Sequence, residues 1–176
     1  KYGSTFLVRR FDRKGAARIH FASAMTMLGK TDGASAADES SYLELVSFIK
    51  ANGAAPKRDL TELWKRIVFS MAVSNTDDHM RNHGFILKAD GWHLSPLYDV
   101  NPVPEGDELS LCVNEDEATI SLGLALEIAP YCEISTKDAA AMAADVLKTV
   151  RENWNRLAAE CGLSRSAQEY MRPAFS

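Results

Sequence analysis

The sequence has no apolar stretch long enough to cross a membrane. Its longest uncharged apolar runs, residues 67–76 and 118–126, reach about half of the roughly 18 residues that a membrane helix needs. No secretory signal is recognisable in it either. We therefore expect no membrane contact.

Cysteine is scarce. The three cysteines, Cys112, Cys132 and Cys161, form no CxxC pair, and any pairing would leave one thiol over. This usage favours a reducing compartment over a disulfide-stabilised secreted scaffold, so the sequence predicts a cytoplasmic protein.

Charge and composition exclude two further classes of protein. A formal net charge of −4 argues against a general nucleic-acid binder, and a hydrophobic fraction of 46% excludes a mainly disordered chain. The charge is uneven, since residues 1–18 hold six basic side chains and one acid, whereas residues 105–117 hold six acids and no base. We interpret the first as a solvated strand face and the second as an exposed loop that could select substrates.

Helical signals dominate after residue 40. Ser41 and Glu44 fit a capping box, which predicts a helix start there. Asp59 is expected to cap the next helix, whose apolar residues recur at helical spacing. They are Leu60, Leu63, Trp64, Ile67, Val68 and Met71. A long helix is predicted over residues 135–162 and a short one after Ser164. The inward face of the long helix would carry Met142, Val146, Val150, Trp154, Leu157 and Cys161.

Two regions predict β structure. Residues 5–11 are β-branched and aromatic, which favours a strand, and residues 85–87 and 92–94 flank an Ala-Asp-Gly turn typical of a hairpin. Three prolines keep the segment after the hairpin out of regular structure. The sequence thus predicts an α+β, mostly helical single domain with a small β-hairpin in its middle.

Chemistry-bearing side chains gather on the two loops beside this hairpin. Asp77 and Asn82 precede it and Asp99 follows it, so the hairpin should bring the three together. Phosphoryl transfer needs such a set, with a carboxylate that takes the proton of the attacking hydroxyl and hard oxygen ligands that hold Mg²⁺. In kinases the base and the metal-binding Asn lie five positions apart, as Asp77 and Asn82 do.

Each of these three residues also has a purely structural explanation. Asp77 could cap the preceding helix or form a turn, and Asn82 could belong to a simple turn before Gly84. Asp99 could merely accept backbone hydrogen bonds ahead of a proline-rich loop. The order of the three around a predicted hairpin favours the chemical explanation.

Two motifs carry a family resemblance. Residues 75–82 fit N-x-D-x-H-x-R-N and residues 97–102 fit L-Y-D-x-x-P. Together they resemble the C-terminal lobe of the HipA family of serine/threonine kinases, the toxins of bacterial toxin–antitoxin pairs. Residues 8–13 (VRRFDR), followed by Arg18-Ile19, are similar to the strand and hinge before that lobe, and residues 161–164 resemble its closing helices. The resemblance touches most of the chain and implies the C-terminal lobe of a protein-kinase-like fold.

The resemblance also implies roles for individual residues. Asp77 would be the catalytic base, and Asn82 and Asp99 would ligate Mg²⁺. The positions expected to contact the nucleotide are Ala22, Ala24, His79, Tyr98 and Asp99. Of these, the backbone between Ala22 and Ala24 would carry the adenine, and His79 would lie near the phosphates.

Cofactors and partners follow from the same resemblance. It implies ATP and Mg²⁺ as cofactors, and phosphorylation of the protein itself and of a protein substrate on serine or threonine. The substrates known in the family are aminoacyl-tRNA synthetases. A DNA-binding antitoxin of the HipB type would be the partner, whereas no direct nucleic-acid binding is expected of this lobe.

The sequence departs from the family pattern in three places. It has no glycine-rich loop followed by a strand lysine, which the other lobe of a kinase supplies. Residues 20–24 lack the acid usual in the hinge, and Arg81 replaces the commoner lysine. We expect residues 1–30 to form a strand and hinge region and residues 31–176 the helical C-terminal lobe, with the N-terminal lobe absent. By itself this chain should neither bind ATP tightly nor catalyse phosphoryl transfer.

Three other functions stay open at this point. A catalytically inactive kinase-like module would only bind an antitoxin or another protein. A small-molecule kinase of the aminoglycoside or choline type would share the base and the metal ligands. A metal-dependent hydrolase built on Asp77, Asp78, His79 and His83 would bind Zn²⁺ or Mn²⁺ without nucleotide.

Overall fold

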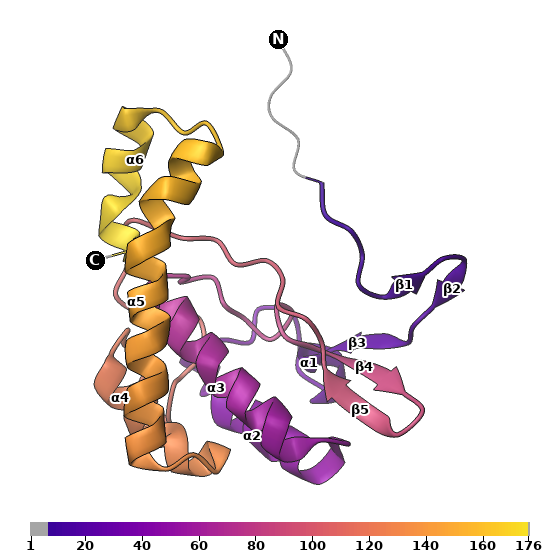
Figure 1. Cartoon of the computed structure of the whole chain (residues 1–176). Coiled ribbons are helices and arrows are strands. Elements are labelled where there is room, and N and C mark those ends of the chain that lie inside the picture. Colours follow the sequence, from indigo (N-terminus) through magenta and orange to yellow (C-terminus); the bar gives the residue numbers. More distant parts are fainter. Residues whose placement is uncertain (1–6, 176) are drawn as a thin grey trace.

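Helix α3 (Pro56–Ala72) lies at the centre of the computed structural model, which describes residues 7–175. Its apolar face is buried as the helical spacing predicted, at Leu60, Leu63, Trp64, Ile67, Val68 and Met71. Three helices pack against it, α2 (Tyr42–Asn52), α4 (Leu122–Ile128) and α5 (Thr136–Glu160) (Figure 1). Trp64 attaches α4, because its Nε1–H donates a 2.7 Å hydrogen bond to the Ala125 carbonyl.

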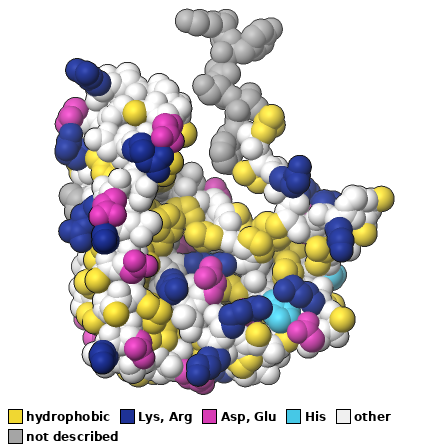
Figure 2. Space-filling view, viewed as in Figure 1, with side chains coloured by type: hydrophobic (Ala, Val, Ile, Leu, Met, Phe, Trp, Pro, Cys, Tyr) yellow, Lys and Arg dark blue, Asp and Glu magenta, His cyan; other side chains and the backbone are white. Residues whose placement is uncertain are grey.

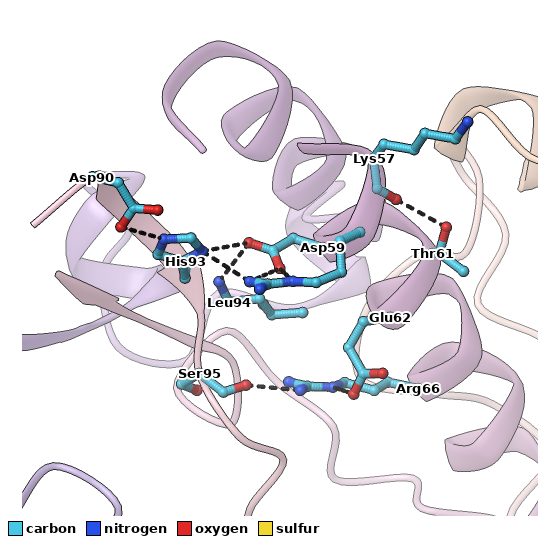
Figure 3. Close-up of polar contacts among 10 residues, drawn as sticks. Lys57, Asp59, Thr61, Glu62, Arg66, Asp90, His93, Leu94 and Ser95 are labelled. Carbon is cyan, nitrogen blue, oxygen red and sulfur yellow. Dashed lines mark hydrogen bonds and ion pairs between the residues drawn. The ribbon is translucent and has the colours of Figure 1, made fainter. Parts of the chain in front are cut away.

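The starts of α2 and α3 differ in how well the sequence predicted them. The capping box of α2 is confirmed, with Ser41 and Glu44 in their expected roles. The prediction that Asp59 caps α3 is wrong, because the helix begins three residues earlier at Pro56, whose fixed φ suits a first helical position. Asp59 is instead buried, and its carboxylate accepts a 3.0 Å hydrogen bond from the Leu94 N–H (Figure 3). It therefore fastens α3 to the sheet.

The predicted hairpin is confirmed as β4 (Gly84–Lys88) and β5 (Gly91–Leu94). A third strand, β3 (Phe21–Ser23), adds to it and gives an antiparallel sheet in the order β3-β4-β5. In this register Ala22 lies opposite Phe85. A strand of three residues is too short to show an alternating pattern, which is why the sequence did not reveal it.

The strand predicted over residues 5–11 is not found where the structure describes the chain. Residues 7–10 form neither helix nor strand, and residues 5 and 6 lie outside the described range. Two short strands follow instead, β1 (Arg13–Lys14) and β2 (Ala17–Arg18), which pair around Gly15 at φ +61°. β-branched and aromatic residues favour a strand only where a neighbouring strand supplies hydrogen bonds and packing.

Helix α5 is confirmed with its Ser135 cap, but its inward face is only partly as predicted. Val150 is buried, whereas Leu157 is 46% exposed. Here α5 leaves the core and pairs with α6 (Arg165–Met171), which Ser164 caps as expected (Figure 1). The remaining short helices are α1 (Ala24–Met27), η1 (Ala36–Asp38), η2 (Ala129–Cys132) and η3 (Arg172–Phe175).

The described residues contain neither a membrane-spanning helix nor a disulfide bond. Between residues 7 and 175 no helix combines the length and the apolar character that crossing a membrane requires. The three cysteines are free thiols, with Cys112 and Cys132 buried and Cys161 exposed.

Candidate active site

The loop between α3 and β4 carries most of the candidate residues. The helix ends at Ala72, and Ser74 adopts φ +47°, which turns the chain sharply away from the helix axis. The Asn75 N–H returns to the Ser70 carbonyl at 2.8 Å, and the Asn82 N–H closes a turn on the His79 carbonyl at 2.9 Å. The loop is thus held by its own backbone and presents residues 76–82 between helix and sheet.

The hairpin brings Asn82 and Asp99 into direct contact. The Asn82 Nδ2 donates a 2.7 Å hydrogen bond to Asp99 Oδ2, although the two residues are 17 positions apart. Asp99 has φ +57°, a conformation that costs energy for a residue with a side chain and is often found at functional sites. Asn101 Nδ2 donates to the other carboxylate oxygen at 3.1 Å.

Amide and carboxylate oxygens are the ligands that Mg²⁺ prefers. Asn82 Oδ1 accepts a 3.1 Å hydrogen bond from the His79 N–H, and a carbonyl oxygen keeps a second lone pair for a further contact. Together with the carboxylate of Asp99, the donor set fits a hard divalent cation.

Asp77 differs from this pair in its surroundings. Its side chain is exposed and lines a cavity of about 220 Å³ together with His79, Arg81 and the loop over residues 31–35. No described residue donates a hydrogen bond to its carboxylate. Arg81, at the same cavity, pairs with Asp32. The Asp77 carboxylate is therefore free to accept a proton from a group that enters this cavity.

A larger cavity of about 970 Å³ lies on the Asp99 side of the loop. Its walls are residues 8–12, Phe21, Phe69 and residues 96–101. Figure 2 shows the hollow between the helices and the arm that carries β1 and β2, with hydrophobic side chains on its floor and Lys and Arg side chains on the arm. An apolar floor with basic side chains at its edge suits a flat aromatic ring that carries phosphates.

Tyr98 forms one wall of this larger cavity, beside Asp99. Its ring packs against Phe11 and Phe21 with centroid separations of 5.7 and 6.0 Å. Its hydroxyl donates a 2.6 Å hydrogen bond to the Arg81 carbonyl. Burial, and next the charge of Asp99, raise the pKa of Tyr98 to about 12. Tyr98 therefore stays neutral and ties the segment after the hairpin to the loop before it.

The cavity does not include the two alanines that the resemblance implied for the adenine. Ala24 is fully buried, and its N–H donates a 2.8 Å hydrogen bond to the His83 carbonyl. Ala22 lies in β3, an edge strand of the sheet, where it pairs with Phe85 on one side and is half-buried. Residues 8–11 and Phe21, the neighbour of Ala22, line the cavity.

A buried polar cluster beneath the loop was not predicted. The Asp78 carboxylate accepts hydrogen bonds from the Tyr42 hydroxyl at 2.7 Å and the Ser70 hydroxyl at 3.0 Å, and it lies 3.0 Å from His83 Nε2. Burial would raise the pKa of Asp78, but His83 and the two hydroxyls outweigh burial and lower it. Burial and the Asp78 charge raise the pKa of Tyr42 well above its usual value. The only signal in the sequence was the second acid of the Asp77-Asp78 pair.

This cluster also bears on the hydrolase alternative. Asp78 and His83 are both almost fully buried and engage each other, whereas Asp77 is exposed at the cavity. Among residues 7–175 no group of three or more His, Cys, Asp or Glu side chains could hold a metal ion together. The geometry therefore gives no support to a site built on Asp77, Asp78, His79 and His83.

Comparison with known protein families identifies the domain. The family model of the HipA-like C-terminal domain matches residues 1–154. The chain belongs to this family. The predicted resemblance is thus confirmed, and with it the α+β fold of a HipA C-terminal lobe.

Two relatives of this HipA-like domain are informative. A Haemophilus influenzae protein named "Putative kinase" is 28% identical over 142 residues, which cover 72% of this chain and 41% of that protein. A chain in the structure of the Shewanella oneidensis MR-1 toxin–antitoxin system HipA, HipB and its operator DNA matches with a TM-score of 0.74 and 15% identity. That match covers 94% of this chain and 46% of the other. The HipA-like domain thus spans less than half the length of both relatives.

Proposed function

We propose that this HipA-like domain is the C-terminal catalytic lobe of an ATP- and Mg²⁺-dependent serine/threonine protein kinase. The observation that carries the proposal is the 2.7 Å contact between Asn82 and Asp99, made across the hairpin from the loop that also holds Asp77. Kinase chemistry requires a base and two metal ligands in this arrangement. The family membership supports the same class of reaction.

Each residue would have a distinct task. Asp77, with its free carboxylate, would orient the hydroxyl of the acceptor and take its proton. Asn82 and Asp99 would hold the Mg²⁺, which neutralises phosphate charge when it is bound. His79 lies on the Asp77 side of the loop, and a contact between it and the phosphates stays a prediction.

The nucleotide would occupy the larger cavity. Tyr98 and Phe11 offer apolar walls for the base, and Asp99 at the rim would meet the phosphates through the metal. Arg9 lines the same cavity and brings positive charge to it, whereas the charge of Arg10 there is paired with Asp12. The adenine contact expected between Ala22 and Ala24 stays a prediction, and residues 8–11 are a second candidate for it.

The partners remain part of this proposal. A protein substrate phosphorylated on serine or threonine, with aminoacyl-tRNA synthetases as candidates, follows from family membership, as does a cytoplasmic location. A HipB-type antitoxin is supported by the assembly named for the Shewanella oneidensis structure. A module without activity is disfavoured, because it would not need the free carboxylate of Asp77 in addition to the Asn82–Asp99 contact.

Transfer of labelled phosphate from ATP tests the proposal. The full-length protein that carries this chain would be incubated with Mg²⁺ and a bacterial extract, beside its Asp77→Asn variant. Loss of a general base lowers such rates by about 100-fold or more, so we expect labelled protein from the first and almost none from the second. Asp145→Asn, at an exposed carboxylate on α5, is the matched control and should retain activity.

The loss of labelling counts only if the Asp77→Asn variant is folded. Thermal unfolding curves of both variants should coincide with that of the unaltered protein, because Asp77 and Asp145 are exposed. Absence of labelling by the unaltered protein, with and without extract, would contradict the kinase proposal.

A further inference from the structure

Asn75 opens the first motif, yet the proposed chemistry gives it no task. Its side chain is 1% exposed. Its Oδ1 accepts a 3.1 Å hydrogen bond from the Asn101 N–H, 26 positions along the chain. A backbone N–H can only donate, so this contact fixes which end of the amide faces Asn101. The Nδ2 end then points toward the Ser70 hydroxyl at 3.5 Å.

Asn101 leads from Asn75 to the metal-binding pair. The backbone N–H of Asn101 donates to Asn75, and the side-chain Nδ2 of Asn101 donates a 3.1 Å hydrogen bond to Asp99 Oδ1. Asn82 holds the other oxygen of the same carboxylate at 2.7 Å. Both oxygens of Asp99 are therefore held by amides, and one of these amides belongs to a residue that Asn75 anchors.

Ser70 leads from Asn75 to the catalytic loop. Its hydroxyl donates to the buried carboxylate of Asp78 at 3.0 Å, and the Tyr42 hydroxyl donates to the same oxygen at 2.7 Å. Asp78 directly follows Asp77 in the chain. The Asn75 amide thus contacts both Ser70, which binds Asp78 next to Asp77, and Asn101, which binds Asp99.

We infer that Asn75 is a positioning residue, whose buried amide sets the place of the Asp99 carboxylate relative to Asn82 and Asp77. The inference rests on the proposed function only in that Asp99 is taken as a metal ligand. Asp99 needs such support because its φ of +57° is unfavourable and the segment after it forms no helix or strand. Groups that orient metal ligands typically change metal affinity or activity by about 10- to 100-fold when they are removed.

Hydrogen–deuterium exchange of the full-length protein tests the structural half. In Asn75→Ala the Asn101 N–H loses its acceptor, so exchange over residues 97–103 should become faster while exchange in α3 stays the same. Asn153→Ala is the matched control, because it removes an amide whose two contacts, with the Thr149 carbonyl and the Arg156 guanidinium, both lie within α5. Unchanged exchange over residues 97–103 in Asn75→Ala would overturn the inference, whatever the metal does.

Metal binding tests the functional half. Mn²⁺ would serve as the probe, with the non-hydrolysable β,γ-imido analogue of ATP, and free Mn²⁺ would be measured by electron paramagnetic resonance. We expect Asn75→Ala to weaken Mn²⁺ binding by about 10- to 100-fold and Asn153→Ala to leave it unchanged. Equal Mn²⁺ affinity in Asn75→Ala and the unaltered protein would overturn the inference.

A second variant guards against loss of folding. Asn101 is exposed, so Asn101→Ala should fold normally while it removes the 3.1 Å contact with Asp99 Oδ1. We expect it to weaken Mn²⁺ binding less than Asn75→Ala does, and an unchanged affinity would count against the inference. If the unaltered protein binds no Mn²⁺ but exchange over residues 97–103 responds to Asn75→Ala, the positioning stands and the proposed function fails.

Discussion

Asp77 and Asp78 are neighbouring aspartates, but their surroundings in the fold give them different roles. Asp77 is exposed at a cavity and free of hydrogen bonds from described residues, whereas Asp78 is 3% exposed and has three partners. One is therefore available to a substrate and the other is committed to the fold. The motif predicted the first role, but the second depends on Tyr42 and Ser70, which come from two different helices.

The buried carboxylate predicts how stability depends on pH. The pKa of Asp78 is lowered in the folded protein, so its contribution is present above the unfolded value of about 3.9 and is lost as the pH falls through the folded value. We expect Asp78→Asn to lower the free energy of unfolding at pH 7 by about 1–3 kcal/mol. The variant should also lose less stability than the unaltered protein between about pH 4 and pH 2, because the titrating group is gone.

Urea unfolding followed by circular dichroism at pH 7 and pH 3 would measure both effects. Asp116→Asn, at an exposed carboxylate of the acidic loop, is the control and should change the free energy of unfolding little. An equally steep loss of stability in Asp78→Asn and the unaltered protein would contradict the role assigned to Asp78.

At the scale of elements, the closeness of β3 and β4 depends on one glycine. A Cβ at Gly84 would overlap the ring of Phe21, with the ring Cζ only 2.6 Å away. Gly84→Ala should therefore force the strands or the ring apart and lower the free energy of unfolding by about 1–3 kcal/mol. Urea unfolding again provides the measurement.

Gly123 offers the matched control for this substitution. It lies in α4, and a Cβ there would meet only the Ser121 hydroxyl oxygen at an ordinary 3.4 Å. Gly123→Ala should leave stability unchanged or raise it by up to about 1 kcal/mol, since alanine favours a helix. Equal effects of the two substitutions would show that the strands are not as tightly packed as described.

The sequence predicted those elements whose signal is local. The capping box at Ser41, the apolar spacing of α3 and the turn between β4 and β5 each lie within one element, and all are confirmed. β3 and the buried position of Asp59 were missed, because both depend on strands about 35 to 65 residues away. The Asn82–Asp99 contact was foreseen because the hairpin connects the two, whereas the contact of Asn75 with Asn101 needed the structure.

At the scale of the whole molecule, the described walls of the proposed nucleotide site all belong to the C-terminal lobe. The chain contains no glycine-rich loop with a strand lysine, and both relatives are more than twice as long as the part it matches. We expect residues 1–176 alone to bind ATP with Mg²⁺ at least about tenfold more weakly than the full-length protein. Isothermal titration calorimetry on both would measure this, after thermal unfolding has shown that residues 1–176 fold. Equal affinities would mean that this chain suffices for the nucleotide.

The short distance in sequence between the site's parts has a consequence for how the protein folds. The contacts that join Asn75 to Asn101 and Asn82 to Asp99 close loops of only 26 and 17 positions. Closing such loops costs little entropy and is fast, whereas docking α5 onto α3 requires ordering a much longer stretch of chain. The geometry of the proposed site should therefore form early in refolding, on the framework of α3 and the hairpin, before the C-terminal helices pack against α3.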